Sequence, residues 1–103
     1  MNTKKSDARK FLEKLTGGPV TLGKLLEAIR LGEELSQTKF AKKLGISRSH
    51  LNDIEKGNKF VSPQRAARFA KALGHSPERF VELSLQALVD ETGLKLKVEI
   101  KAA

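Results

Sequence analysis

The sequence predicts an all-α fold of five helices, and two observations carry this prediction. First, apolar residues recur at helical spacing in five segments. Second, each segment begins at a serine or threonine that can cap a helix, and a glycine closes each of the last four. The expected helices span residues 21–31, 36–44, 47–57, 62–73 and 76–92.

Residues 1–20 are expected to form a basic N-terminal arm that contains one short amphipathic helix. Phe11, Leu12 and Leu15 share a helical face, and the sequence TGGP ends it, because two glycines and a proline lower helix propensity. The first main helix follows and is capped by Thr21. Its apolar stripe consists of Leu22, Leu25, Leu26 and Ile29.

The second and third main helices are one apolar pattern interrupted at Gly45. Ser36 and Ser47 stand at their starts, and Gly57 closes the later one. A helix that ends in a left-handed residue favours a position without Cβ, which explains the glycine at the break. The inward-facing residues are expected to be Phe40, Ala41, Leu44, Leu51 and Ile54.

The last two helices share a start signal, a serine followed by a proline, at Ser62 and Ser76. The tail after Gly93 has a different pattern, because apolar and charged residues alternate strictly over LKLKVEIK. Alternation of this kind predicts a short C-terminal β-strand. No other segment has clear strand periodicity, so the partner of this strand is expected outside the chain.

Composition excludes several classes of function. A chain of 103 residues buries only about two-thirds of its unfolded surface, which disfavours multi-step chemistry in a deep cleft. There is no cysteine, and two histidines, His50 and His75, are too few for a histidine-rich metal site. No nucleophile–base set or phosphate-cradling loop is visible. We therefore expect a protein without cofactor, metal or catalytic activity. No membrane-spanning segment or signal peptide is visible in the sequence, so we expect the protein to be cytoplasmic.

The net charge of +8 is concentrated in the middle of the chain. Residues 36–75 contain nine basic and two acidic side chains, whereas residues 1–35 contain seven and five, and residues 76–103 four and five. Such a patch favours a polyanion through phosphate neutralisation and counterion release. A solubilising surface is the alternative, but it does not explain the concentration in one third of the chain.

The break at Gly45 has a functional interpretation. Two short helices joined by a tight glycine turn cross steeply, so that one can enter a major groove while the other lies across the phosphate backbone. The crossing requires a small residue, supplied by Ala41, and the turn requires a glycine four positions later. These features predict a helix-turn-helix.

Here the sequence resembles the lambda-repressor-like (XRE-type) helix-turn-helix family of phage repressors, Cro proteins and bacterial antitoxins, over about residues 22–75. The resemblance implies a five-helix DNA-binding domain. It also implies that Glu55 forms a structural ion pair with Arg30. The chain then divides into an arm (1–20), a DNA-binding domain (21–75), and a dimerisation helix with the strand (76–103). The matching residues are Ser36, Gln37, Phe40, Ala41, Gly45, Ile46, Ser47, Leu51, Asn52, Ile54, Glu55, Gly57 and Pro63.

The third main helix is expected to read bases. Leu51 and Ile54 fix its buried side, so its polar residues lie on the opposite side. Arginine can bond guanine in a bidentate way, asparagine can bond adenine, and aspartate can accept from cytosine. A solvated polar face is the alternative, and the resemblance favours the start of the helix. The candidates are Arg48, Ser49, Asn52 and Asp53.

Phosphate contacts are expected around this helix. The resemblance assigns a phosphate contact to Gln37 at the start of the preceding helix, where helix N-termini favour anions. Lys42 and Lys43 can equally be a solvated face. The full set of candidates is Gln37, Lys39, Ser47, His50, Asn58 and Lys59.

We expect a sequence-specific repressor that binds a two-fold operator in double-stranded DNA as a homodimer. The size of the chain resembles the antitoxin of a type II toxin–antitoxin pair, with a stand-alone phage or plasmid repressor as the alternative. A protein-bridging adaptor with this fold is a third interpretation, disfavoured by Arg48. The tail is expected to pair with its copy or with a toxin's sheet edge, a frayed tail being the alternative. The expected dimer interface is Val81, Leu85, Leu88, Leu94, Leu96, Val98 and Ile100.

Overall fold

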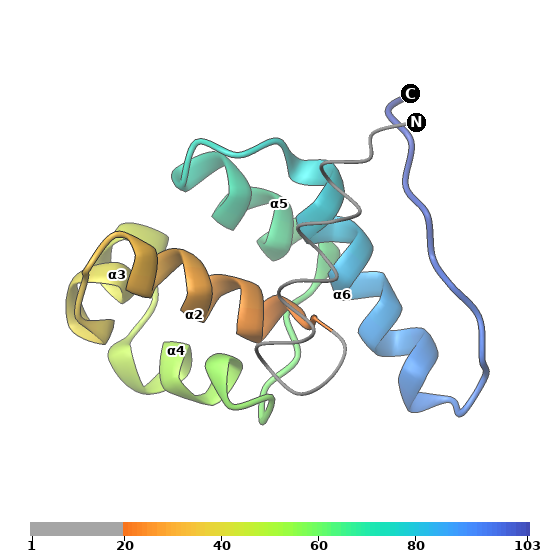
Figure 1. The fold of residues 1–103 in the computed structure, drawn as a ribbon, viewed down its shortest axis with the longest axis horizontal. Helices are drawn as coiled ribbons and strands as arrows, with labels where there is room; N and C mark the ends of the chain where they lie inside the picture. The colour runs from red at the N-terminus through yellow and green to blue at the C-terminus, as the bar shows by residue number, and fades with distance from the viewer. Residues whose placement is uncertain (1–19) are drawn as a thin grey trace.

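The computed structural model describes residues 20–103, so the expected N-terminal arm and its short helix lie outside the described residues. Five helices form as predicted, with α5 and α6 packed against each other on one side of the molecule (Figure 1). No membrane-spanning helix occurs within residues 20–103. The helices are α2 (Leu22–Gly32), α3 (Gln37–Leu44), α4 (Arg48–Glu55), α5 (Pro63–Ala72) and α6 (Pro77–Glu91).

The predicted caps position the helix starts. In α2 to α5 the hydroxyl of the cap residue accepts a hydrogen bond from the backbone N–H three residues on, at 3.0–3.2 Å. Such a cap contributes about 1 kcal/mol. Ser76 makes no side-chain cap bond, and Pro77 alone marks the start of α6. The caps are Thr21, Ser36, Ser47 and Ser62.

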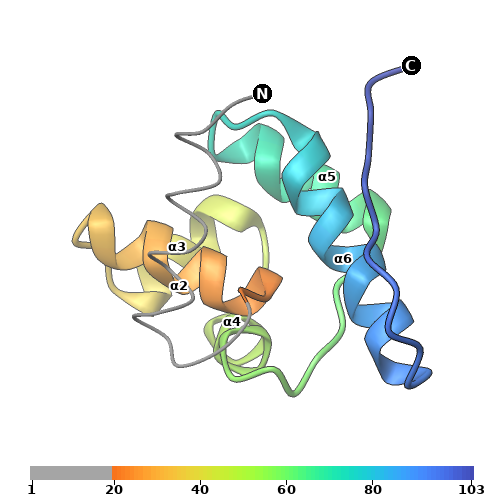
Figure 2. The same ribbon diagram turned by 45° about the vertical axis from the view of Figure 1, so that its right-hand side comes forward.

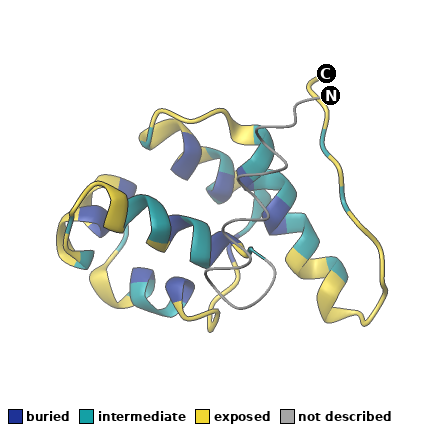
Figure 3. Cartoon of the chain, in the orientation of Figure 1, coloured by how far each residue is buried: buried dark blue, intermediate teal, exposed yellow. Residues whose placement is uncertain are grey.

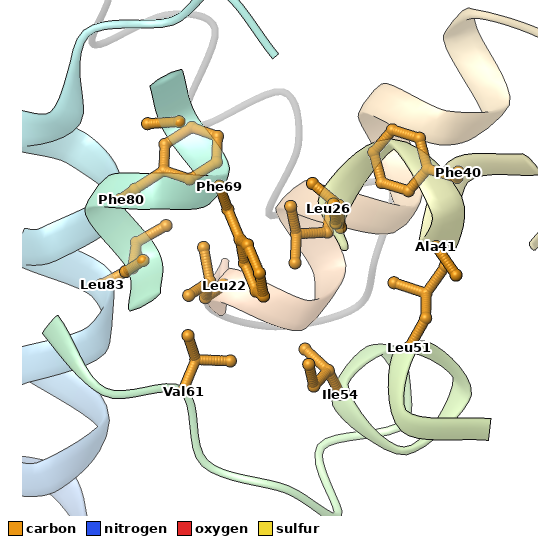
Figure 4. Close-up of a cluster of buried hydrophobic side chains, with 13 residues drawn as sticks. Leu22, Leu26, Phe40, Ala41, Leu51, Ile54, Val61, Phe69, Phe80 and Leu83 are labelled. Atoms are coloured by element: carbon orange, nitrogen blue, oxygen red, sulfur yellow. The ribbon is translucent and has the colours of Figure 1, made fainter. Parts of the chain in front are cut away.

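One hydrophobic core joins all five helices (Figure 4). Phe40 of α3, Leu26 of α2 and Leu51 of α4 are fully buried in it. Figure 3 shows the consequence for the ribbon, with buried residues on the facing sides of the helices and exposed residues outside. A buried hydrogen bond from Ser84 Oγ of α6 to the Val61 carbonyl, 2.6 Å long, fixes α6 to the segment before α5.

The helices α2 and α4 approach each other closely at Gly23. Gly23 is buried in the first turn of α2, and a Cβ added there would lie 2.1 Å from the Ile54 carbonyl oxygen. No side chain fits into that distance. The position of α4 against the core therefore depends on the missing side chain of Gly23.

The prediction of a C-terminal β-strand is wrong for the single chain, because residues 94–103 contain no strand. The tail is extended and runs beside α6 (Figures 1 and 2). Its polar backbone groups bond to side chains of α6 rather than to a second strand. Gln86 Nε2 donates to the Leu96 carbonyl at 2.8 Å, and the Val98 N–H donates to Gln86 Oε1 at 2.7 Å. The Ile100 N–H donates to Glu82 Oε2 at 3.2 Å.

Gly23→Ala is expected to lower the free energy of unfolding by about 3 kcal/mol, because α2 and α4 must separate to admit the methyl group. Urea denaturation followed by circular dichroism measures the change. Gly32→Ala is the matched control, since nothing lies within 4 Å of a Cβ at that position and alanine favours a helix. Equal stability of Gly23→Ala and the wild type would contradict the close packing of α2 on α4.

Candidate nucleic-acid interface

The helices α3 and α4 form a helix-turn-helix around Gly45. Gly45 adopts the left-handed conformation, with φ of 75°, and its N–H donates to the Lys42 carbonyl at 3.2 Å. The next N–H, from Ile46, donates to the Ala41 carbonyl at 3.0 Å. Ala41 is buried. The turn thus provides hydrogen-bond donors for carbonyl groups at the end of α3, and α4 begins three residues after Gly45.

The side of α4 away from the core is open to solvent at its N-terminal end. Leu51 and Ile54 are buried, whereas Arg48 and Ser49 in the first turn are exposed. Asn52 and Asp53, one turn later, are half-buried. The four residues expected to read bases therefore lie on one helix, and its first turn is the most accessible part.

The residues expected to contact phosphate lie around this helix. Lys39 of α3 and Ser47, Asn58 and Lys59 at the two ends of α4 are exposed. The backbone N–H of Asn58 donates to the Asp53 carbonyl at 2.8 Å, which fixes the loop at the C-terminal end of α4. A DNA backbone lying against α4 would meet hydrogen-bond donors at both ends of this helix.

His50 of this set is less accessible, and Lys43 of α3, which lies outside the set, is paired. His50 is half-buried, and its backbone N–H donates to Ser47 Oγ at 3.0 Å. Lys43, which sequence alone left between two interpretations, bonds Glu33 Oε1 through its Nζ at 3.0 Å. That bond partly neutralises Lys43, so Lys39 and Lys42 are the lysines of α3 that have no ion-pair partner within residues 20–103.

A part-buried ion pair joins the C-terminal end of α4 to α2. Arg30 Nε donates to Glu55 Oε2 at 2.8 Å, and Arg30 Nη2 donates to Glu55 Oε1 at 3.0 Å. Arg30 Nη1 donates to the Leu35 carbonyl at 3.1 Å. One guanidinium thus joins the end of α2, the loop before α3 and the end of α4. The bond to Glu55 raises the pKa of Arg30, although burial opposes this, so the guanidinium stays charged at physiological pH.

Gln37 extends this ion pair into a network that reaches the exposed side of α4. Its Nε2 donates to Glu55 Oε1 at 3.0 Å and to Asn52 Oδ1 at 3.1 Å. Both amide protons of Gln37 are therefore used, since a primary amide has two. In this arrangement the Gln37 side chain has no donor for a phosphate, and its backbone N–H at the start of α3 is the group that can serve.

The hydrogen bonds that link Gln37 to Asn52 and Glu55 were not predicted from the sequence. One signal could have indicated them, because Asn52 and Glu55 are three residues apart on α4 and so share a side of the helix. The bond also fixes the amide of Asn52, since Oδ1 faces Gln37 and Nδ2 is left as the donor for a ligand. Asn52 thus presents a donor to acceptors such as the guanine N7 and O6 atoms.

The residues expected at a dimer interface lie apart from the helix-turn-helix. Leu88, Leu94 and Leu96 are exposed, with 42%, 56% and 60% of their surface accessible. Val81, Leu85, Val98 and Ile100 are half-buried. Within residues 20–103 no cluster of histidine and acidic side chains could hold a metal ion.

The crossing of α3 and α4, the exposed first turn of α4 and the surrounding lysines define a helix-turn-helix DNA-binding unit. Comparison with known proteins agrees, because the helix-turn-helix domain family matches residues 21–83. That is more than half of the chain, and the chain belongs to this family of DNA-binding regulators.

A curated relative is the ImmF control region 10 kDa protein of Bacillus phage phi105. It is 43% identical over 49 residues, which are 48% of this chain and 54% of the relative. The chain thus matches about half the length of this relative. No solved structure matches the chain.

Glu55→Gln is expected to lower the free energy of unfolding by about 2 kcal/mol, because an amide group would face the donors of Arg30 and Gln37 and leave the half-buried guanidinium without its carboxylate partner. Thermal and urea denaturation measure the loss. Glu33→Gln is the matched control, since it removes only the exposed pair with Lys43 and should change stability by less than about 0.5 kcal/mol. Similar losses in the two variants would contradict an anchoring role for Glu55.

Proposed function

We propose that this protein is a sequence-specific transcriptional repressor that binds a two-fold DNA operator as a homodimer. The observation that carries the proposal is the exposed first turn of α4, with Arg48 accessible, on a helix that a part-buried ion pair fixes to the domain. Preorganised side chains lose less conformational entropy on binding. The same geometry supports placing the chain in the lambda-repressor-like subgroup.

Base reading is assigned to three residues of α4 in order of accessibility. Arg48 is exposed and can donate two hydrogen bonds to one guanine. Ser49, also exposed, can donate or accept. Asn52, held by Gln37, presents its Nδ2. Asp53 is the remaining candidate, and its carboxylate contributes only where a cytosine amino group donates to it, because phosphates repel it.

Phosphate binding is assigned to the groups around α4. Lys39 and Lys59 supply charge, and Ser47 and Asn58 supply hydrogen bonds. The first N–H groups of α3 and α4 add partial positive charge. His50 and the backbone N–H of Gln37 complete the set. These contacts fix the orientation of α4 without reading sequence.

A homodimer is proposed because one such helix reads too few base pairs for useful affinity. The exposed Leu88 on α6 and the exposed Leu94 and Leu96 on the tail supply apolar surface away from α4. A dimer formed there would leave both copies of α4 open to DNA.

Among repressors, the phage relative favours a stand-alone phage-type repressor over an antitoxin, because that relative is named for a phage control region. The antitoxin alternative depends on a toxin partner, and a co-purification with the product of the neighbouring gene tests it. The adaptor alternative predicts no DNA binding, and the exposed Arg48 disfavours it.

Arg48→Ala is expected to weaken operator binding by roughly 1–3 kcal/mol and to leave binding to random DNA nearly unchanged, because its contacts are to a base. Lys39→Ala should weaken both and reduce the salt dependence by about one unit of slope, because its contact is to a phosphate. Fluorescence anisotropy over a salt series measures both. Equal losses on operator and random DNA for Arg48→Ala would exclude it from base reading.

Truncation after Gly93 is expected to leave the helical domain folded, because no residue of the hydrophobic core lies in the tail. The same truncation should weaken dimerisation and operator affinity together. Sedimentation equilibrium and circular dichroism of the shortened protein measure the two effects. A dimer of undiminished strength at micromolar concentration would show that the interface does not include the tail.

A further inference from the structure

The C-terminal tail has two different backbone edges. In an extended segment the N–H and C=O groups of alternate residues point to the same side. The Leu96 carbonyl and the N–H groups of Val98 and Ile100 point to α6, where Gln86 and Glu82 bind them. The groups of the residues between them therefore point away from α6.

That outer edge is unpaired in the part of the chain that the structure describes. Lys95, Lys97 and Glu99 are exposed, and no backbone hydrogen bond within residues 20–103 involves them. An unpaired edge of this kind is a template for another strand.

Gln86 acts on the tail as a neighbouring strand would. Its amide donates to the carbonyl of Leu96 and accepts from the N–H of Val98, which are the two groups that a strand residue would satisfy. The tail is thereby held extended along α6, with its outer edge already in the conformation that pairing requires. Little conformational freedom remains to be lost when a second strand binds.

We propose that the outer edge of the tail pairs with the same edge of a second copy of this chain, antiparallel, with the two-fold axis at Val98. The inference rests on the homodimer of the proposed function and names the part of the chain that forms it. The tail becomes a β-strand only in the dimer, which is consistent with its extended, unpaired state in the single chain.

Charge excludes the registers on either side of Val98, and the apolar pairs described next distinguish an axis at Val98 from one at Ile100, which would also pair Glu99 with a lysine, Lys101. In a two-fold antiparallel pair the central residue faces its own copy, and the residues on either side face each other. An axis at Val98 places Lys97 opposite Glu99 of the second copy, twice. An axis at Lys97 would place two lysines opposite each other, and an axis at Glu99 would oppose two glutamates. Like charges directly opposite are destabilising.

The apolar residues fit the same register. With the axis at Val98, Val98 faces its copy and Leu96 faces Ile100 of the second copy on one side of the ribbon. Cross-strand apolar pairs of this kind stabilise a sheet. A two-stranded ribbon alone is marginal in water, but here each strand already packs on a helix. The exposed Leu94 and Leu96 would gain neighbours that the single chain does not provide.

Disulfide trapping tests the register in the full-length protein, which contains no native cysteine. Val98 and its copy would form a non-hydrogen-bonded pair with Cα atoms about 4.5 Å apart, within the range of a disulfide. Val98→Cys should therefore form a covalent dimer under mild oxidation. Leu96→Cys is the control, because its copy would be about 13 Å away along the ribbon. Lys97→Cys would be trapped only if the two-fold axis lay at Lys97, and Glu99→Cys only if it lay at Glu99, so these two variants test the rejected registers.

A charge exchange gives a second readout that does not depend on cysteine. Lys97→Glu and Glu99→Lys should each weaken the homodimer, by about tenfold, because two attractive pairs become repulsive. An equimolar mixture of the two variants should recover the wild-type affinity as a heterodimer, since each glutamate then faces a lysine. Sedimentation velocity at low salt measures all three.

Preferential trapping of Val98→Cys together with rescue in the mixture supports the proposal. A Val98→Cys protein that remains monomeric under oxidation overturns it, as does equal trapping of Lys97→Cys or Leu96→Cys. Pairing with the sheet edge of a different protein would give this monomeric result. Operator binding of the reduced Val98→Cys protein is measured separately, so a failed register leaves the proposed function standing, and a failure to bind any operator contradicts the function alone.

Discussion

The ion pair between Arg30 and Glu55 is the interaction on which the DNA-facing part of the structure depends. It joins α2, the loop before α3 and the end of α4 through one guanidinium and one carboxylate. A part-buried pair of this kind contributes less to net stability than to the choice of one arrangement, because desolvation offsets much of the attraction. Here the pair fixes the relative positions of the helices. The Glu55 carboxylate accepts hydrogen bonds from three donors, and those donors come from two other segments of the chain. The exposed first turn of α4 is positioned because its last turn is fixed.

The helices were predictable because their signals are local. Serine caps, Ser-Pro starts and the glycine at the break depend on a few neighbouring residues, and all five helices of the described chain begin at the expected places. The small residue where the helices cross, Ala41, is likewise evident from spacing. Gly23 was not predictable, since only the three-dimensional approach of α2 to α4 shows why a Cβ is excluded there. The hydrogen bonds of Gln37 were not predictable from the sequence either, because they join residues 15 and 18 positions apart.

The tail shows why a correct pattern led to a wrong element. Strict alternation indicates an extended backbone with two different faces, and the tail has that conformation. A strand additionally needs a partner for its backbone groups, and here one edge is bound by side chains of α6. Sequence periodicity carries no information about such helix-to-tail bonds, because Gln86 is an ordinary polar residue on an exposed part of a helix. The extended conformation was therefore predictable and its partner was not.

The structure contains two polar networks, and they lie on different sides of the molecule. The network of Arg30, Glu55, Gln37 and Asn52 lies behind and beside α4, whereas Gln86 and Glu82 hold the tail along α6, on the other side of the α5–α6 pair (Figure 1). In the proposed dimer, DNA contacts and self-association would draw on separate surfaces, and neither would need residues of the other. Coupling between them would then arise from mass action alone: a second copy held at the tail would bring a second α4 to the same operator, which raises affinity by effective concentration rather than by any change in α4. Such a dimer would convert a weak single contact into specific binding without a conformational switch.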